Sequence, residues 1–188
     1  MTVVSNADNN LLKLYTIDDD FINDLRKNVN EHIFANIDPR YRHSRKYIGI
    51  LLKISGFSYY APLSSPKESD YMLLNERKVI RNSILPIIRM TETDSKGQRS
   101  LLGTIKLSNM IPVPDSKISK YDLDNEPDSD YKDLVLKETR FINRNEETIT
   151  AYAEKLYKEK TEGIVKKGYL DNTFDFLAFE KYISEKYM

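Results

Sequence analysis

The stretch Tyr47–Lys67, which reads YIGILLKISGFSYYAPLSSPK, decides the fold. Its first eight residues are rich in isoleucine and leucine and predict a buried strand. Ser55-Gly56 predicts a turn, and the alternating run Phe57–Leu63 predicts a returning strand. The stretch therefore predicts a β-hairpin in the middle of the chain.

The second strand of this hairpin meets two prolines, Pro62 and Pro66. Proline has no N–H for the next rung of a sheet, so pairing is expected to stop there. A strand that ends in this way can direct its last side chains into a cleft. Two hydroxyls and a lysine stand at this end, namely Ser64, Ser65 and Lys67.

Further strands and helices are predicted on both sides of the hairpin. Before it, residues 11–15 favour a strand, and a helix is expected from Thr16, with an apolar stripe that His32 and Ile33 extend. After it, residues 86–91 and 101–107 favour a second hairpin, residues 110–113 a short edge strand and residues 115–129 a surface loop. Residues 71–85 are compatible with a helix or an irregular crossover.

The C-terminal third predicts helices. Residues 131–160 carry one long amphipathic pattern, in which Glu138 falls on the apolar stripe with Val135 and Ile142, and residues 174–187 predict a closing helix. Strands in the middle with helices around them, and no βαβ alternation, predict an α+β fold. We expect a strongly twisted antiparallel sheet or small open barrel flanked by helices.

Length and composition limit the class of protein. The 188 residues predict a single domain, 1–188, and no run of 18 uncharged apolar residues predicts a membrane span. The chain has no cysteine, which excludes disulfides, thiolate nucleophiles and cysteine-based zinc sites. Met1–Asn10 lacks the features of a secretory signal, so we expect a short, loosely ordered leader and a cytoplasmic protein without membrane contact.

Charge is unevenly distributed although the formal net charge is zero. Residues 39–67 hold six basic residues and no acid, whereas residues 115–138 hold eight acids against four lysines. In the basic segment, aromatic residues alternate with cations, a composition that suits single-stranded RNA because cations hold phosphates and rings stack on bases. The RNA-binding residues expected here are Arg40, Arg42, His43, Arg45 and Lys46. A solvated loop leading into a strand is the alternative interpretation.

Several common chemistries lack support in this sequence. The two histidines, His32 and His43, have no metal-binding spacing, and the aspartates 18–20 and 124, 128 and 130 match no metal motif. There is no phosphate-binding loop and no Gly-x-Ser-x-Gly elbow. Hydroxyls, lysines, arginines and 13 tyrosines remain. They suit cleavage of RNA by its own 2′-hydroxyl, which needs alignment, charge stabilisation and proton transfer but neither an enzyme nucleophile nor a cofactor.

Short blocks in a fixed order give a family resemblance. The blocks are Lys13–Ile17, Asp38–Tyr41, Lys46–Ile50, Tyr60–Lys67, Leu102–Ile105, Met110–Val113 and Arg140–Ile142. Together they resemble the ToxN/AbiQ family of type III toxin–antitoxin endoribonucleases, and the block around Ser64-Ser65-Pro66-Lys67 is the most specific.

The resemblance implies a core similar to the MazF/Kid toxins and a metal-independent RNase that leaves 2′,3′-cyclic phosphate and 5′-hydroxyl ends. It further implies inhibition by a small repeated pseudoknot RNA, a closed protein–RNA assembly, and phage defence by abortive infection.

The resemblance also implies residue roles. Ser64 and Ser65 would contact the scissile phosphate, Lys67 would stabilise its charge, and Tyr41 would lie near the cleft. Phe141 would pack or stack beside the cleaved nucleotide. Phe21 stands where the family can have a tyrosine, which leaves it stacking or packing only. The general base remains open among tyrosine, lysine and histidine, and a noncatalytic RNA-binding module is the alternative function.

Overall fold

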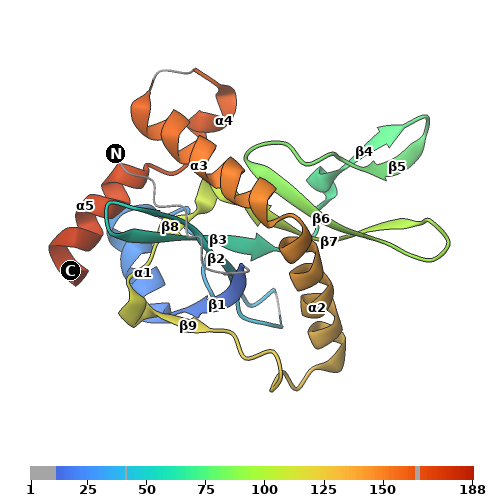
Figure 1. The fold of residues 1–188 in the computed structure, drawn as a ribbon, viewed down its shortest axis with the longest axis horizontal. Coiled ribbons are helices and arrows are strands. Elements are labelled where there is room, and N and C mark those ends of the chain that lie inside the picture. The colour runs from blue at the N-terminus through green and yellow to red at the C-terminus, as the bar shows by residue number, and fades with distance from the viewer. Residues whose placement is uncertain (1–11, 41, 164–165) are drawn as a thin grey trace.

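One antiparallel sheet organises the chain. The structure is a computed structural model that describes residues 12–40, 42–163 and 166–188, so the expected leader Met1–Asn10 lies outside the described residues. The strand order is β6 (Ile87–Thr93), β7 (Arg99–Lys106), β3 (Phe57–Ser64), β2 (Tyr47–Ile54), β1 (Lys13–Ile17) and β9 (Ile118–Lys120), and β8 (Ile111–Pro112) pairs with β3 (Figure 1). The sheet ends in two different strands, β6 and β9, so it is open. The predicted α+β class is confirmed, and the closed form of a barrel is not adopted. The MazF/Kid-like core and the single domain 1–188 stay predictions.

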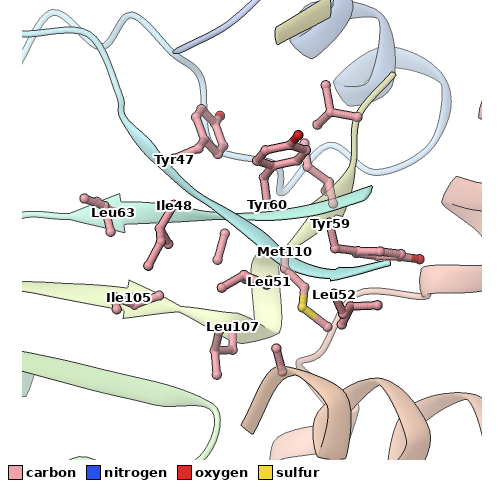
Figure 2. Close-up of a cluster of buried hydrophobic side chains, with 14 of the residues drawn as sticks. Tyr47, Ile48, Leu51, Leu52, Tyr59, Tyr60, Leu63, Ile105, Leu107 and Met110 are labelled. Atoms are coloured by element: carbon pink, nitrogen blue, oxygen red, sulfur yellow. The ribbon is translucent and has the colours of Figure 1, made fainter. Parts of the chain in front are cut away.

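The central hairpin consists of β2 (Tyr47–Ile54) and β3 (Phe57–Ser64), as predicted. Ser55 and Gly56 form its turn, and both have positive φ, which a two-residue hairpin turn of this kind requires. Side chains alternate between the two faces of the hairpin. Figure 2 shows Tyr47 and Tyr60 on one side of the strands and Ile48 and Leu107 on the other, and all four are buried.

Strand β3 continues through Pro62, as the predicted range Phe57–Leu63 implies, and ends at Ser64, before Pro66. Pro62 still pairs with Tyr47 of β2, and the backbone N–H of Leu63 donates to the carbonyl of Lys46 at 2.9 Å. The proline therefore interrupts one rung only. Leu63 and Ser64 then pair with Ile105 and Thr104 of β7 (Arg99–Lys106), so β3 passes from one neighbour to another as it approaches its end.

The outer strands agree in part with the predictions. The hairpin of β6 (Ile87–Thr93) and β7 is confirmed, and β8 (Ile111–Pro112) is the short strand expected near residue 111. The first strand, β1 (Lys13–Ile17), begins later than predicted. The supposed loop 115–129 contains β9 (Ile118–Lys120), which pairs with β1. A strand of three residues is too short to show a hydrophobic period in the sequence. It can be recognised only by its pairing with β1, which is far away along the chain.

Residues 71–85 form neither a helix nor a crossover but a separate hairpin of β4 (Tyr71–Leu74) and β5 (Arg77–Ile80). It projects beyond the main sheet (Figure 1). Leu73 and Leu74 are 74% and 55% exposed. Because the hairpin buries neither face fully, its sequence lacks the alternation by which strands are recognised.

The helices begin and end at other residues than predicted. Asp18 rather than Thr16 caps α1 (Asp19–Asn28), since its carboxylate accepts the N–H of Phe21 at 2.9 Å. The expected long helix is two helices, α2 (Ser129–Arg144) and α3 (Glu146–Glu162), divided at Asn145. A short helix α4 (Gly168–Asp171) follows, and α5 (Phe176–Tyr187) closes the chain as predicted.

The side-chain amide of Asn145 explains the division between α2 and α3. It donates to the carbonyl of Phe141 at 2.7 Å, and this bond satisfies one of the carbonyl groups at the C-terminal end of α2. This break gives the two helices separate positions on the sheet, with α2 against β6 and β7 and α3 against β2. In the described part of the chain, no helix is both long and apolar enough to cross a bilayer.

Candidate functional site

A pocket of about 220 Å³ lies where β3 ends, between the segment that precedes β2 and the first half of α2. It brings together several residues that the sequence singles out and several that it does not. The lining residues are Asn36, Asp38, Arg42, His43, Ser44, Arg45, Lys46, Leu63, Ser64, Ser65, Pro66, Leu102, Tyr131, Leu134 and Glu138.

Ser64 and Ser65 stand at the pocket as the last residue of β3 and the first residue after it. Ser64 is held by its pairing with Thr104, whereas Ser65 and Pro66 are exposed. The hydroxyl of Ser64 has only a long contact, 3.5 Å, to the carbonyl of Ser65. The strand therefore fixes the backbone of Ser64, and the adjacent hydroxyls of Ser64 and Ser65 have capacity left for a ligand.

Lys67 follows directly and is exposed. It is not among the residues that line the pocket, but its ammonium lies 5.9 Å from the ring centroid of Phe34, the ring that also faces Arg45. The backbone N–H of Lys67 donates to Asp70 at 3.0 Å, and Asp70 is 1% exposed. Asp70 in turn accepts from the guanidinium of Arg89 on β6 at 3.1 Å. A buried ion pair thus anchors the turn that carries Lys67.

Arg45 and Lys46 line the pocket from its other side. Arg45 donates to the carbonyls of Leu63 at 2.8 Å and Ala35 at 3.2 Å, so it ties the basic segment to the end of β3. Lys46 is 7% exposed, and its ammonium donates to the carbonyl and hydroxyl of Ser44 and lies 4.5 Å from the ring of Tyr121. Burial lowers the pKa of Lys46.

His43 is stacked flat on Tyr131 of α2, with the ring centroids 3.7 Å apart. One oxygen of Asp128 lies 3.2 Å from the Nε2 atom of His43 and 3.0 Å from the guanidinium of Arg42. Asp128 also caps α2 by accepting the N–H groups of Asp130 and Tyr131. The bond from the Tyr131 amide is the first reason that the pKa of Asp128 is lowered, and the nearby charge of Arg42 adds to it.

Tyr131 and Glu138 are pocket residues that the sequence interpretation missed. Burial raises the pKa of the Tyr131 hydroxyl. Glu138 is 8% exposed, and burial raises the pKa of its carboxyl group to about 8. Its signal was visible as a carboxyl group on the apolar stripe of a helix, where an unpaired acid is rarely placed. Tyr131 had no comparable signal, because its partner His43 is distant in sequence.

Three further predicted residues, Arg40, Phe141 and Phe21, are not among those that line the pocket. Arg40 is exposed and makes a paired contact with Asp38 that contributes to holding the pKa of Asp38 near 2. Phe141 packs partly buried against the core. Phe21 is 1% exposed and contacts the ring of Tyr187 edge-on, with centroids 5.0 Å apart. Tyr41 lies outside the described residues. The RNA contacts of Arg40, Phe141 and Phe21 stay predictions.

The pocket supplies hydroxyls, cations, a stacked imidazole and a buried carboxyl group. Such a set can bind a phosphodiester and exchange protons with it. Within residues 12–40, 42–163 and 166–188, no three His, Cys, Asp or Glu side chains gather as metal ligands would. The pocket thus has a basic wall from residues 42–46 and a hydroxyl wall from the end of β3.

Comparison with known proteins places this geometry in a family. Residues 13–184 match the family of toxin ToxN of type III toxin–antitoxin systems. The endoribonuclease ToxN of Pectobacterium atrosepticum is 31% identical over 172 residues, which cover 91% of this chain and 92% of that protein.

Two solved structures share the fold. One, from a study of a processed non-coding RNA that regulates a bacterial antiviral system, has a TM-score of 0.74 at 27% identity and covers 94% of this chain and 99% of that one. Another, from a study of selective toxin inhibition by a non-coding RNA pseudoknot, has a TM-score of 0.73 at 27% identity over 94% of this chain and 98% of that one. The match over nearly the whole chain confirms the resemblance, and the chain belongs to the ToxN family of type III toxin–antitoxin toxins.

Proposed function

We propose that this chain is an endoribonuclease toxin that cleaves RNA by attack of the 2′-hydroxyl on the adjacent phosphate, without a metal ion. The observation that carries the proposal is the meeting of the Ser64-Ser65 hydroxyls with a basic wall and a histidine in one pocket. A relative that aligns over most of this chain is named an endoribonuclease, which supports the same reaction class.

In this reaction the 2′-oxygen forms a bond to phosphorus as the bond from phosphorus to the 5′-oxygen breaks. One proton leaves the 2′-hydroxyl and one is delivered to the departing 5′-oxygen. The products are a 2′,3′-cyclic phosphate and a 5′-hydroxyl. The enzyme's part is to align the two oxygens with phosphorus and to stabilise the negative charge that develops on the phosphate.

Each proposed residue has a part in this reaction. Ser64 and Ser65 donate hydrogen bonds to phosphate oxygens, and Lys67 neutralises the developing charge from its anchored turn. Arg42 and Arg45 hold the neighbouring backbone, with Arg45 already oriented by the Leu63 carbonyl. His43, oriented by Asp128, and Tyr41 are the proposed groups for proton transfer. The choice between them as base and acid stays open.

The proposed partners are RNAs. We propose a small repeated RNA folded as a pseudoknot as antitoxin, cellular or phage RNA as target, and a closed toxin–antitoxin assembly in the cytoplasm. The study of selective toxin inhibition by a pseudoknot RNA, on a structure of the same fold, supports this class of inhibitor. The link of a related structure to an antiviral system supports a role in abortive infection by phage.

Substitution of the proposed residues tests the site. Ser65→Ala and Lys67→Ala should each reduce RNA cleavage by at least about 10²-fold, the usual loss when one group that stabilises developing charge is removed. Both side chains are exposed, so the temperature of unfolding should change little. Single-turnover cleavage of a defined RNA measures the first effect and thermal unfolding the second.

Matched controls are Ser69→Ala, two residues beyond Lys67, and Lys53→Ala on β2, both exposed and neither lining the pocket. They should cleave RNA as the unmodified chain does. Excess EDTA should also leave the rate unchanged. Full activity in both Ser65→Ala and Lys67→Ala would refute the site assignment, and inhibition by EDTA would refute the metal-independent mechanism.

A further inference from the structure

Glu138 is a buried acidic residue of the pocket that the reaction above does not use. Its side chain comes from α2 and reaches the pocket wall while the residue is 8% exposed. Among the described residues, nothing donates a hydrogen bond to this carboxyl group or pairs with it, and burial is the cause of its raised pKa. A buried polar group without a partner carries a free-energy cost, which a ligand in the pocket would offset.

The neighbouring strand is built to admit this carboxyl group. A Cβ atom at Gly103 of β7 would lie 2.7 Å from Glu138 Oε1 and 3.0 Å from the carbonyl oxygen of Ser64, closer than side chains are normally tolerated. The absence of a side chain at position 103 thus lets Glu138 approach the strand end that carries the proposed catalytic serines. The carboxyl group therefore lies close to the backbone at the end of β3.

The space in front of Glu138 is small and partly apolar. Its walls include Leu63, Pro66, Leu102 and Leu134. The whole pocket, at about 220 Å³, is smaller than a typical drug-sized site of roughly 300–1,000 Å³, and the apolar residues in its otherwise polar lining suit the face of one flat heteroaromatic ring. In RNA the groups of this kind are unstacked bases, which proteins read on their hydrogen-bonding edges.

We propose that Glu138 reads the edge of one base next to the scissile phosphate and so sets part of the sequence preference of cleavage. This inference rests on the proposed ribonuclease function. A carboxylic acid offers one O–H donor beside one acceptor oxygen. That pair complements a ring nitrogen beside an amino group, the edge that adenine and cytosine present. A carboxylate offers acceptors only and complements the N1–H and amino group of guanine.

With a pKa of about 8, Glu138 holds its proton at neutral pH, so adenine or cytosine is the favoured base. Other ionisable groups surround it. Tyr131 lies on the same helix, and Asp38, Arg42, His43, Arg45 and Lys46 line the facing wall. On the β6 side, Glu92 is paired with Lys137 at 3.2 Å. Because these neighbours also place charge around the pocket, the test compares Glu138 with a side chain that keeps its shape and does not ionise.

Glutamine at position 138 meets that requirement, since its amide presents one donor face and one acceptor oxygen at every pH. A randomised pool of 2′-deoxy oligonucleotides, which the protein cannot cleave, is bound to the 188-residue chain at about pH 6 and about pH 9, and bound sequences are counted. We expect adenine or cytosine to be enriched about tenfold at one position at the lower pH. The enrichment should fall or shift to guanine at the higher pH.

Glu138→Gln should retain the adenine or cytosine preference at both pH values, and Glu138→Ala should lose it at both. Glu147→Gln, an exposed position on α3, is the matched control and should behave as the unmodified chain. Base preferences that are the same in the unmodified chain, Glu138→Gln and Glu138→Ala would overturn the inference, as would a pH shift that persists in Glu138→Gln. Because binding is measured without cleavage, an inactive protein would refute the proposed function and not this inference.

Discussion

At the scale of the single residue, Glu138 links stability to pH in a direction opposite to most acids. Its pKa in the folded chain is about 8, above the ordinary value near ~4.3 for an unfolded chain. Between these values the folded state holds a proton that the unfolded state has released. The free energy of unfolding must therefore fall as pH rises through this window, by up to about 1.4 kcal/mol per pH unit from this group alone.

Glu138→Gln should remove this contribution. The variant should be more stable than the unmodified chain at about pH 8, with the difference shrinking toward about pH 5, where both chains carry a neutral group at position 138. Urea unfolding at a series of pH values measures this difference. A difference that is constant with pH would contradict a raised pKa. Glu147→Gln, which removes an exposed charge, supplies the reference slope.

At the scale of the element, the turn after β3 depends on a buried ion pair. Asp70 accepts from the backbone of Lys67 and from Arg89, which is 6% exposed and also donates to the carbonyl of Asn82 at 2.9 Å. One carboxylate thus joins the turn to β6 and fixes the direction in which Lys67 leaves the strand. Loss of the carboxylate leaves the Arg89 charge buried without its partner.

Asp70→Ala should therefore lower the free energy of unfolding by about 3–5 kcal/mol. It should also lower the cleavage rate, because the turn that carries Lys67 is no longer held. Asp70→Asn, which keeps an acceptor for the Lys67 N–H but not the charge, should lose stability with a smaller loss of rate. Urea unfolding and single-turnover cleavage separate the two effects. Equal rates in both variants and the unmodified chain would show that Lys67 needs no such anchor.

Elements whose own sequence carries the signal were predictable. The prediction of the β2–β3 hairpin was correct because a buried apolar run, a Ser-Gly turn and an alternating run follow one another in the sequence. The β4–β5 hairpin was missed because its exposed leucines give no alternation, and the α2–α3 break was missed because the apolar stripe continues across Asn145. In both places a local backbone feature, positive φ at residues 75 and 76 or a side-chain bond at Asn145, overrides the hydrophobic pattern.

The part of the pocket that the central hairpin brings together was predictable from the sequence, and the part that α2 contributes was not. The basic segment precedes β2 and the two serines end β3. The hairpin of these strands therefore brings Ser64 and Ser65 next to the basic segment. Tyr131 and Glu138 reach the same pocket from a helix far along the chain. Their positions depend on how α2 lies across β6 and β7, which no pattern within the helix states. Long-range packing, rather than local propensity, completes the pocket.

At the scale of the whole molecule, charge is separated although the net charge is zero. The acidic segment supplies Asp128, which contacts the pocket residues Arg42 and His43. Part of the basic surface is thus neutralised in the free protein. An RNA phosphate that binds Arg42 must compete with Asp128. The affinity for RNA should therefore depend on salt according to the small number of phosphate contacts, and not according to the net charge of the protein.

Arg42→Ala should weaken RNA binding similarly for all sequences and reduce the slope of log affinity against log salt by about 0.7, the value for one lost phosphate contact on a single strand. Its side chain is 81% exposed, so stability should be nearly unchanged. Titrations of an uncleavable RNA at several salt concentrations measure the slope. An unchanged slope would remove Arg42 from the interface, and Lys53→Ala on β2 is the control.

The central claim is that the pocket at the end of β3 cleaves RNA through the 2′-hydroxyl. The most direct test is to incubate the purified chain with cellular RNA in EDTA, and to sequence the new ends by their chemistry, beside the Ser65→Ala and Lys67→Ala variants. We expect new 5′-hydroxyl ends and matching 2′,3′-cyclic phosphate ends, both absent from the reactions of the two variants. New 5′-phosphate ends, or no cleavage by the folded unmodified chain, would contradict the central claim.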